Sequence, residues 1–276
     1  MRIDAHQHYW KIERTDYGWL QPSSGLLYAD FMPEHLRPHL NRYEIDKSVV
    51  VQAAPSVAET EFLLNIASHE ETIAGVVGWL DLEAADLQQQ WERLHRNPKF
   101  VGIRPMIQDL PSDWILQPRV IDNLKFLAES GFSVDLQSNP RHLPHLVRLM
   151  KLVPNLRAVI DHLATPSYND GLLEPWAGNM MELASYPTVM CKLSGMVYGK
   201  DRPGWSPQAV RPFAEHVITA FGRQRVMFGT DWPVCLRYAT FDEVMSLMES
   251  MLDSGWSTNE RANVYGMNAA RFYGLT

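Results

Sequence analysis

The chain has 276 residues, of which 46% are hydrophobic and 21% charged, a balance typical of a globular protein with a sizeable core. Its formal net charge of −7 argues against nucleic acid or an anionic membrane surface as the main partner. Two cysteines are too few for a disulfide framework, no apolar run reaches transmembrane length and no signal peptide is visible, so we expect a cytoplasmic protein.

Short apolar runs recur along the whole chain, and each is followed by turn residues and a helical stretch. The runs are nearly continuous in Val, Ile, Leu and Phe, which predicts strands buried on both faces of a parallel sheet. They are Arg2–Ala5, Lys47–Gln52, Ile73–Leu80, Phe100–Pro105, Ser133–Gln137, Arg157–Asp161, Thr188–Leu193 and Arg225–Gly229.

The segments between these runs have helical spacing. They are His35–Tyr43, Glu59–Ser68, Ala84–Arg96, Arg119–Ser130, Arg141–Leu152, Leu173–Ser185, Pro207–Phe221 and Phe241–Ser254, with Asn259–Tyr273 as an extra C-terminal helix. Ser56 and Thr258 are in place to cap helices, while Asn139 and Ser206 each precede a proline at the first helical position.

Eight alternating strand and helix units with no linker predict one α/β domain over residues 1–276, folded as a (β/α)8 barrel. The alternative is an open doubly wound sheet, which would need a glycine-rich phosphate loop after the first strand. The sequence there is His-Gln-His-Tyr-Trp, so we favour the barrel.

The first strand carries His6 and His8, whose side chains should share one face about 6.6 Å apart along the strand. Paired imidazoles are typical of a metal site or an acid–base site. The loop that follows, from Tyr9 to Met32, is long and aromatic, and we expect it to cover the active site as a lid.

Polar and aromatic side chains follow the predicted strands, where the carboxyl ends of a barrel converge on one pocket. Each of the eight predicted strand and helix units has at least one such side chain where its strand ends. The residues are His6, His8, Gln52, Trp79, Asp81, Arg104, Gln137, His162, Lys192, Ser194, Asp231 and Trp232.

Three of these segments resemble the amidohydrolase superfamily: Ile3–His8, Asp161-His162 and Phe228–Pro233. With Val101–Arg104, they resemble more closely its amidohydrolase-related branch of sugar-lactone hydrolases. The resemblance extends over residues 3 to 273. It implies a distorted (β/α)8 barrel and hydrolysis of a sugar lactone such as an L-fucono- or L-rhamnonolactone.

The departures from the superfamily pattern concern its metals. Binuclear members bridge two ions with a Lys or Glu from strand four and hold the second ion with a His from strand five, where this chain has Arg104 and Gln137. Arginine stays protonated and glutamine is a poor zinc ligand, so we expect no binuclear centre. His6, His8, His162 and Asp231 remain as ligands for at most one zinc ion, and we expect that no cofactor is required.

For a lactone, we expect Asp231 to be the general base, because it lies at the end of the eighth strand and Trp232 and Pro233 would desolvate it and raise its pKa. His6, His8 and His162 would then steer the water or polarise the carbonyl, and Arg104 would stabilise the developing negative charge. The expected substrate contacts are Trp10, Gln52, Trp79, Gln137 and Trp232, with Met106 and Tyr198 as further candidates.

Four alternatives stay open at this point. The chain could be a mononuclear zinc-dependent decarboxylase of the same superfamily, with Arg104 holding a substrate carboxylate, or a non-catalytic barrel that binds sugar acids. Lys192 could form a Schiff base. Ser194 could act as a nucleophile, although it lacks a Gly-x-Ser-x-Gly elbow and reads better as a turn serine. A small-molecule sugar lactone is the expected partner, and a homo-oligomer is one of the open oligomeric states.

Overall fold

The computed structural model describes residues 1–171, 173–252 and 254–275 and contains one eight-stranded parallel sheet in the order β1 to β8. Each strand begins and ends within two residues of its predicted run. The strands are β1 (Ile3–Gln7), β2 (Lys47–Val51), β3 (Ile73–Gly78), β4 (Phe100–Ile103), β5 (Ser133–Leu136), β6 (Arg157–Ile160), β7 (Val189–Leu193) and β8 (Val226–Phe228).

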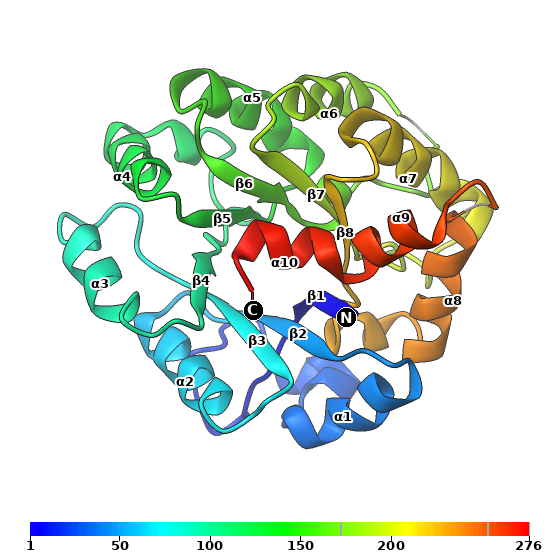
Figure 1. Ribbon diagram of the computed structural model, residues 1–276, viewed down its shortest axis with the longest axis horizontal. Coiled ribbons are helices and arrows are strands. Elements are labelled where there is room, and N and C mark those ends of the chain that lie inside the picture. The colour runs from blue at the N-terminus through cyan, green and yellow to red at the C-terminus, as the bar shows by residue number, and fades with distance from the viewer. Residues whose placement is uncertain (172, 253, 276) are drawn as a thin grey trace.

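The helices form a ring outside the strands, and α10 crosses the centre of the ring (Figure 1). This order confirms the (β/α)8 barrel and excludes the open doubly wound sheet. The helices are α1 (Pro33–Arg42), α2 (Val57–Ala67), α3 (Leu87–Leu94), α4 (Pro118–Glu129), α5 (Leu143–Leu152), α6 (Trp176–Ala184), α7 (Pro207–Phe221), α8 (Phe241–Met251), α9 (Thr258–Ala262) and α10 (Asn268–Tyr273). In the described part of the chain, no helix has the length and apolar character needed to cross a membrane.

Two of the predicted caps are present. Ser56 accepts a hydrogen bond from the backbone N–H of Glu59, and Ser206 accepts one from Ala209. The prediction for Thr258 was one residue off, because Ser257 is the cap and Thr258 is the first helical residue. The predicted helix Phe241–Ser254 includes Asp253, which lies outside the described residues.

The barrel closes between β1 and β8 through two backbone hydrogen bonds. Asp231 N–H donates to the His6 carbonyl at 2.8 Å, and His8 N–H donates to the Trp232 carbonyl at 2.7 Å. The register of β1 against β2 shifts between Asp4 and Gln7, where β1 contains a bulge. A bulge adds one residue and redirects the side chains that follow it. The seam that closes the barrel therefore also brings His6 and His8 next to Asp231.

The floor of the barrel is apolar. Side chains of the strands pack there against α10 in one apolar cluster. The cluster includes Ile3, Ala5, Val49, Val51, Val77, Val159, Met190 and Met227 from the strands and Ala269 and Phe272 from α10. The predicted C-terminal helix is thus confirmed as α9 and α10, joined by a π-helical turn over Asn263–Met267. Because this end is filled, the open end of the barrel is the one that carries the carboxyl ends of the strands.

Residues 11–30, which we call the roof loop, are anchored at both ends. Trp10 and Phe31 exchange two backbone hydrogen bonds of 2.9 and 3.0 Å, which pinch the base of the loop. The loop also has its own small core, in which Trp10, Tyr17, Leu20 and Leu27 pack against residues 53 and 54. The loop contributes Trp19 to the cavity described below.

Candidate active site

A cavity of about 240 Å³ lies where the carboxyl ends of the strands meet. This is where the active sites of (β/α)8 barrels occur. Its walls are formed by His8, Trp19, Ala53, Arg104, Met106, Gln108, Asp109, Gln137, His162, Tyr198, Asp231 and Val234.

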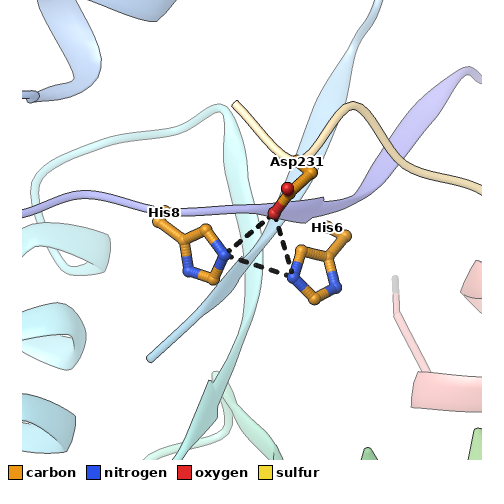
Figure 2. Close-up of side chains that lie close together, drawn as sticks. All are labelled: His6, His8 and Asp231. Carbon is orange, nitrogen blue, oxygen red and sulfur yellow. Dashed lines mark hydrogen bonds and ion pairs between the residues drawn. The ribbon is translucent and has the colours of Figure 1, made fainter. Parts of the chain in front are cut away.

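His6 and His8 converge on Asp231, as Figure 2 shows. The two Nε2 atoms are 3.2 Å apart, and Asp231 Oδ1 lies 3.2 Å from His8 Nε2 and 3.6 Å from His6 Nε2. Nδ1 of His8 is 2.7 Å from the Val51 carbonyl oxygen, which orients the ring. The predicted shared orientation of the two histidines is confirmed.

Asp231 is held in a conformation that few non-glycine residues adopt, with φ of 59°. Its Oδ2 accepts a hydrogen bond of 2.6 Å from the Tyr198 hydroxyl. Burial alone would raise the pKa of Asp231. This effect is outweighed by the electrostatic interaction with His162, by the hydrogen bond with His8 and by the electrostatic interaction with His6, which together lower that pKa below its ordinary value. The expected rise in the Asp231 pKa was therefore wrong, because the prediction considered desolvation and not the three histidines.

His162 begins a turn of four successive residues with positive φ, from His162 to Thr165. Such left-handed runs are costly for non-glycine residues and tend to be retained where a side chain must be aimed. His162 Nε2 lies 3.9 Å from Asp231 Oδ1, and its Nδ1 is 2.7 Å from the Ser194 hydroxyl. Ser194 lies behind the histidine, at the side away from Asp231, so the geometry gives no support to a Ser194 nucleophile.

The two innermost histidines are neutral near pH 7. Burial, reinforced by Lys192, holds the pKa of His6 well below its ordinary value of 6.5. Burial also lowers the pKa of His162, although Asp231 opposes the shift. The reaction end of the cavity therefore combines one carboxylate with neutral imidazoles.

A buried ionic network lies directly beneath His6. Lys192 on β7 is 2.5 Å from Asp135 Oδ2, 3.1 Å from Asp161 Oδ1 and 3.1 Å from His6 Nδ1. Burial raises the pKa of Asp135 to about 6, whereas Lys192 and His6 overcome burial and hold the pKa of Asp161 well below its ordinary value. Enclosed in this way, Lys192 offers no amine to the cavity for a Schiff base.

The opposite side of the cavity comes from β4 and β5 and carries polar atoms without partners. Arg104 donates to the Gln52 carbonyl, and Gln52 Nε2 donates to the Arg104 carbonyl at 2.8 Å. Within the described part of the chain, Arg104 Nε, Gln108 Oε1 and Gln137 Oε1 are buried and have no hydrogen-bond partner. A buried polar atom without a partner is costly, so these atoms point to groups that a ligand supplies.

Four predicted contacts do not line this cavity. Trp10 is in the core of the roof loop, Gln52 lies behind Arg104, and Trp232 is buried against Tyr9 and Phe31. Trp79 lines a separate hollow above α2 and α3, together with Asp81. For these residues the geometry supports a structural role rather than substrate contact.

Sequence reasoning missed other parts of the wall. Trp19, Gln108 and Asp109 come from loops. The path of these loops is not predicted by the rule that site residues follow the carboxyl ends of the strands, which we call the strand-end rule. Tyr198 and Met106 were named only as further candidates, and both line the cavity. Tyr198 could have been given more weight, since it follows the turn at Gly195, where φ is 63° and an added Cβ would collide with the His162 side chain.

The donor atoms fit a single divalent ion. Ligands of tetrahedral zinc lie about 3.3 Å from one another, and the three separations among His6, His8 and Asp231 are 3.2 to 3.6 Å. A second group that shares His6, formed with Asp161 and His162, has similarly close donor atoms. A metal at His6, His8 and Asp231 is therefore sterically reasonable, with one coordination position left for water.

A closed parallel barrel with an inward His-x-His pair on β1 and an aspartate after β8 defines the class of (β/α)8-barrel enzymes that act on small molecules at the strand ends. The chain belongs to the amidohydrolase family, whose pattern matches residues 3–275.

Individual relatives are similar along their full length. The L-fucono-1,5-lactonase of Burkholderia ambifaria is 38% identical, and the alignment covers 99% of this chain and 95% of that protein. The L-fucono-1,5-lactonase of Burkholderia multivorans is 35% identical, with 100% and 96% covered. A crystal structure of an amidohydrolase from Burkholderia multivorans with bound zinc is 35% identical and has a TM-score of 0.93, with 100% of both chains covered.

Proposed function

We propose that this protein hydrolyses a sugar lactone, with L-fucono-1,5-lactone or a similar aldonolactone as substrate and the sugar acid as product. The observation that carries the proposal is the Asp231 carboxylate, held among three histidines at one end of a cavity whose other end presents unpartnered polar atoms. Two relatives that are 38% and 35% identical over nearly the whole chain are named L-fucono-1,5-lactonases, which supports the substrate class.

Asp231 is the proposed general base. Water that attacks the lactone carbonyl must lose a proton, and the ionised Asp231 accepts it. A lowered pKa makes this carboxylate a weaker base but makes its protonated form a stronger acid. The same proton can then pass to the ring oxygen that leaves, so one residue serves both half-reactions.

The lactone carbonyl needs donors for the charge that develops on its oxygen. Arg104 has a buried Nε–H without a protein partner, and it is a fixed cation at every pH of interest. His6 and His8 face Asp231 and would orient the attacking water on that side. The proposed arrangement therefore puts the water near the histidines and the carbonyl oxygen toward Arg104.

Within this proposal, no metal is required. Lactones are esters and are intrinsically easier to hydrolyse than amides, so positioned donors and a carboxylate base are chemically sufficient. An ion held by His6, His8 and Asp231 would supply a lower pKa to its bound water. Chelation distinguishes the metal-free reaction from the metal-dependent one, because thorough removal of metal leaves the first intact and abolishes the second.

A panel of lactones tests the proposal. L-Fucono-, L-rhamnono- and related 1,4- and 1,5-lactones are supplied to chelator-treated protein, and acid release is followed with a pH indicator. We expect acceleration over buffer for at least one 1,5-lactone, with little change on chelation. No acceleration across the panel would overturn the lactonase proposal, and lactone hydrolysis that appears only with zinc would overturn the metal-free form of the reaction.

A further inference from the structure

The nitrogen of His6 that faces away from the cavity contacts an ammonium group. Lys192 Nζ lies 3.1 Å from His6 Nδ1 in hydrogen-bond geometry, and both side chains are fully buried. An ammonium group has three N–H donors and no acceptor. The contact is therefore a hydrogen bond from Lys192 to a lone pair on Nδ1, which leaves the proton of the neutral ring on Nε2.

Two buried carboxylates pair with Lys192. Asp135 Oδ2 accepts from Nζ at 2.5 Å, and Asp161 Oδ1 is 3.1 Å away. The Tyr273 hydroxyl, on α10, lies 2.9 Å from both oxygens of Asp135 and fixes that carboxylate from below. The Lys192 side chain therefore has the opposite charges around it that a buried ion pair requires.

Asp161 is the competing partner for His6. Its Oδ1 lies 3.4 Å from His6 Nδ1, and a carboxylate at that point would favour the opposite tautomer, with the proton on Nδ1. However, this contact is longer than the one from Lys192 Nζ, which lies 3.1 Å from His6 Nδ1 in hydrogen-bond geometry. The shorter contact with the better geometry is the one with Lys192.

His8 does not decide the tautomer of His6. Its Nδ1 is 2.7 Å from the Val51 carbonyl oxygen, which can only accept, so His8 carries a proton on Nδ1. Its Nε2 lies 3.2 Å from both His6 Nε2 and Asp231 Oδ1, so this nitrogen is shared between the other ring and the carboxylate. The contact with Lys192 is therefore the one that sets the tautomer of His6.

We propose that Lys192 is a positioning residue that holds His6 in the Nε2–H tautomer, so that His6 presents a hydrogen-bond donor, rather than a lone pair, toward Asp231 and the bound substrate. The tautomer itself does not depend on the enzyme's substrate. The consequence that His6 donates to the attacking water or to the lactone rests on the proposed function.

The tautomer also works against a metal at this site. A metal ligated by His6 Nε2 requires the lone pair there, so the proton must move to Nδ1. That move breaks the Lys192 hydrogen bond and leaves Asp161 Oδ1, 3.4 Å away, as the acceptor for Nδ1–H. Removing Lys192 should therefore strengthen zinc binding and weaken metal-free catalysis.

The direct test is the nitrogen NMR spectrum of chelator-treated protein labelled with ¹⁵N-histidine, recorded near pH 7.5. Two-bond proton–nitrogen correlations identify the protonated nitrogen of each ring, and the His6 signals are assigned by their loss in His6→Gln. We expect His6 to be protonated on Nε2. A His6 ring protonated on Nδ1 would overturn the proposal, and this result needs neither a substrate nor a Lys192 variant.

Two variants test the role of Lys192 itself. Lys192→Met alone would leave two buried carboxylates without a cation, so it is paired with Asp135→Asn, and the single Asp135→Asn variant is the matched control. We expect the double variant to shift the His6 proton to Nδ1 and to bind zinc at least about tenfold more tightly than the control, measured by competition with a chromophoric chelator. An unchanged His6 spectrum together with equal zinc affinity would overturn the assigned role of Lys192.

Catalysis provides the last readout. If the protein is a lactonase, the double variant should lose kcat relative to Asp135→Asn with little change in KM, because the His6 donor acts on the reacting atoms. If no lactone is hydrolysed, the NMR and zinc results still decide the tautomer. Failure of the proposed function and failure of this inference are therefore distinguishable.

Discussion

The two sides of the cavity differ in how their polar groups are paired. On the side built from β1, β6 and β8, which we call the reaction wall, His6, His8, His162 and Asp231 contact one another or fixed protein groups. On the side built from β4 and β5, which we call the recognition wall, Arg104, Gln108 and Gln137 each keep a buried polar atom without a partner in the described structure.

This difference indicates a division of labour. Groups that already hold one another are preorganised, and preorganised dipoles and charges are what lower a reaction barrier. Groups left unpartnered in the free protein gain most when a ligand arrives, which favours binding and discrimination among hydroxyl patterns. Mutations should therefore affect kcat on the reaction wall and KM on the recognition wall, except at Arg104, which the proposed mechanism also places beside the carbonyl oxygen.

The largest effect is expected for Asp231→Asn. Removing the proposed base should lower kcat by about 10³, within the range for general acid–base catalysis, with KM changed by less than about threefold. Asp109→Asn is the matched control, since Asp109 is an exposed carboxylate lining the same cavity. Initial rates of acid release measure both, and an equal loss in the two variants would contradict a specific role for Asp231.

Arg104→Lys should have the next largest effect, because Arg104 spans both functions. Lysine keeps the charge but loses the planar set of donors that contacts Gln52 and leaves Nε free for the substrate. We expect kcat to fall by about 10². A variant whose kcat is unchanged while its KM rises would assign Arg104 to recognition alone.

Gln137→Leu should separate binding from stability. The substitution removes a buried Oε1 that has no partner within the described residues, so the melting temperature should not fall. The KM should rise by about tenfold with kcat nearly unchanged, because a substrate hydroxyl loses its acceptor. Kinetics on a lactone that lacks one hydroxyl give the control, and an equal KM increase for every deoxy analogue would contradict hydroxyl reading by Gln137.

The last prediction concerns stability rather than catalysis, namely the pH dependence of the contacts that hold the roof loop. Buried Glu59 accepts from the Tyr17 hydroxyl at 2.8 Å and from Ala53 N–H at 3.1 Å, and Ala53 in turn accepts from Trp19. Burial raises the pKa of Glu59 to about 7, so between its unfolded value of about 4.5 and pH 7 the folded protein binds the extra proton.

The direction of the pH dependence follows from the extra proton that the folded protein binds at Glu59. Glu59 contributes most to the free energy of unfolding at low pH and loses that contribution as the pH rises toward 7. The wild type minus Glu59→Gln difference in the free energy of unfolding should fall by about 2 kcal/mol from pH 5 to pH 7. Urea unfolding at the two pH values measures it, and a constant difference would show that Glu59 does not titrate in this range.

The strands were predictable because residues buried on both faces leave continuous apolar runs in the sequence. The strand-end rule also placed Arg104, Gln137, His162 and Asp231 around one cavity. It failed for Trp79, whose side chain leaves the barrel after β3, and for Trp232, which turns back to pack on Phe31. The apolar runs show where each strand ends, whereas the direction of the following loop depends on tertiary packing.

Other features needed the three-dimensional arrangement. The bulge in β1 that redirects His6 has no glycine or proline to mark it in the sequence. The low pKa of Asp231 depends on histidines from β1 and β6 that are far away in the chain. The contact between Lys192 and His6 joins positions 186 residues apart, so the sequence offered only a lysine at a strand end.

The central claim is that the reaction wall performs the chemistry and the recognition wall binds the sugar. Its most direct test is the affinity of a non-hydrolysable 1,5-lactam analogue of the substrate for Asp231→Asn and for Gln137→Leu, measured by calorimetry. The account predicts that Asp231→Asn binds the lactam within about threefold of the wild type, whereas Gln137→Leu binds it about tenfold more weakly. The reverse order of affinities would contradict the division between the two walls.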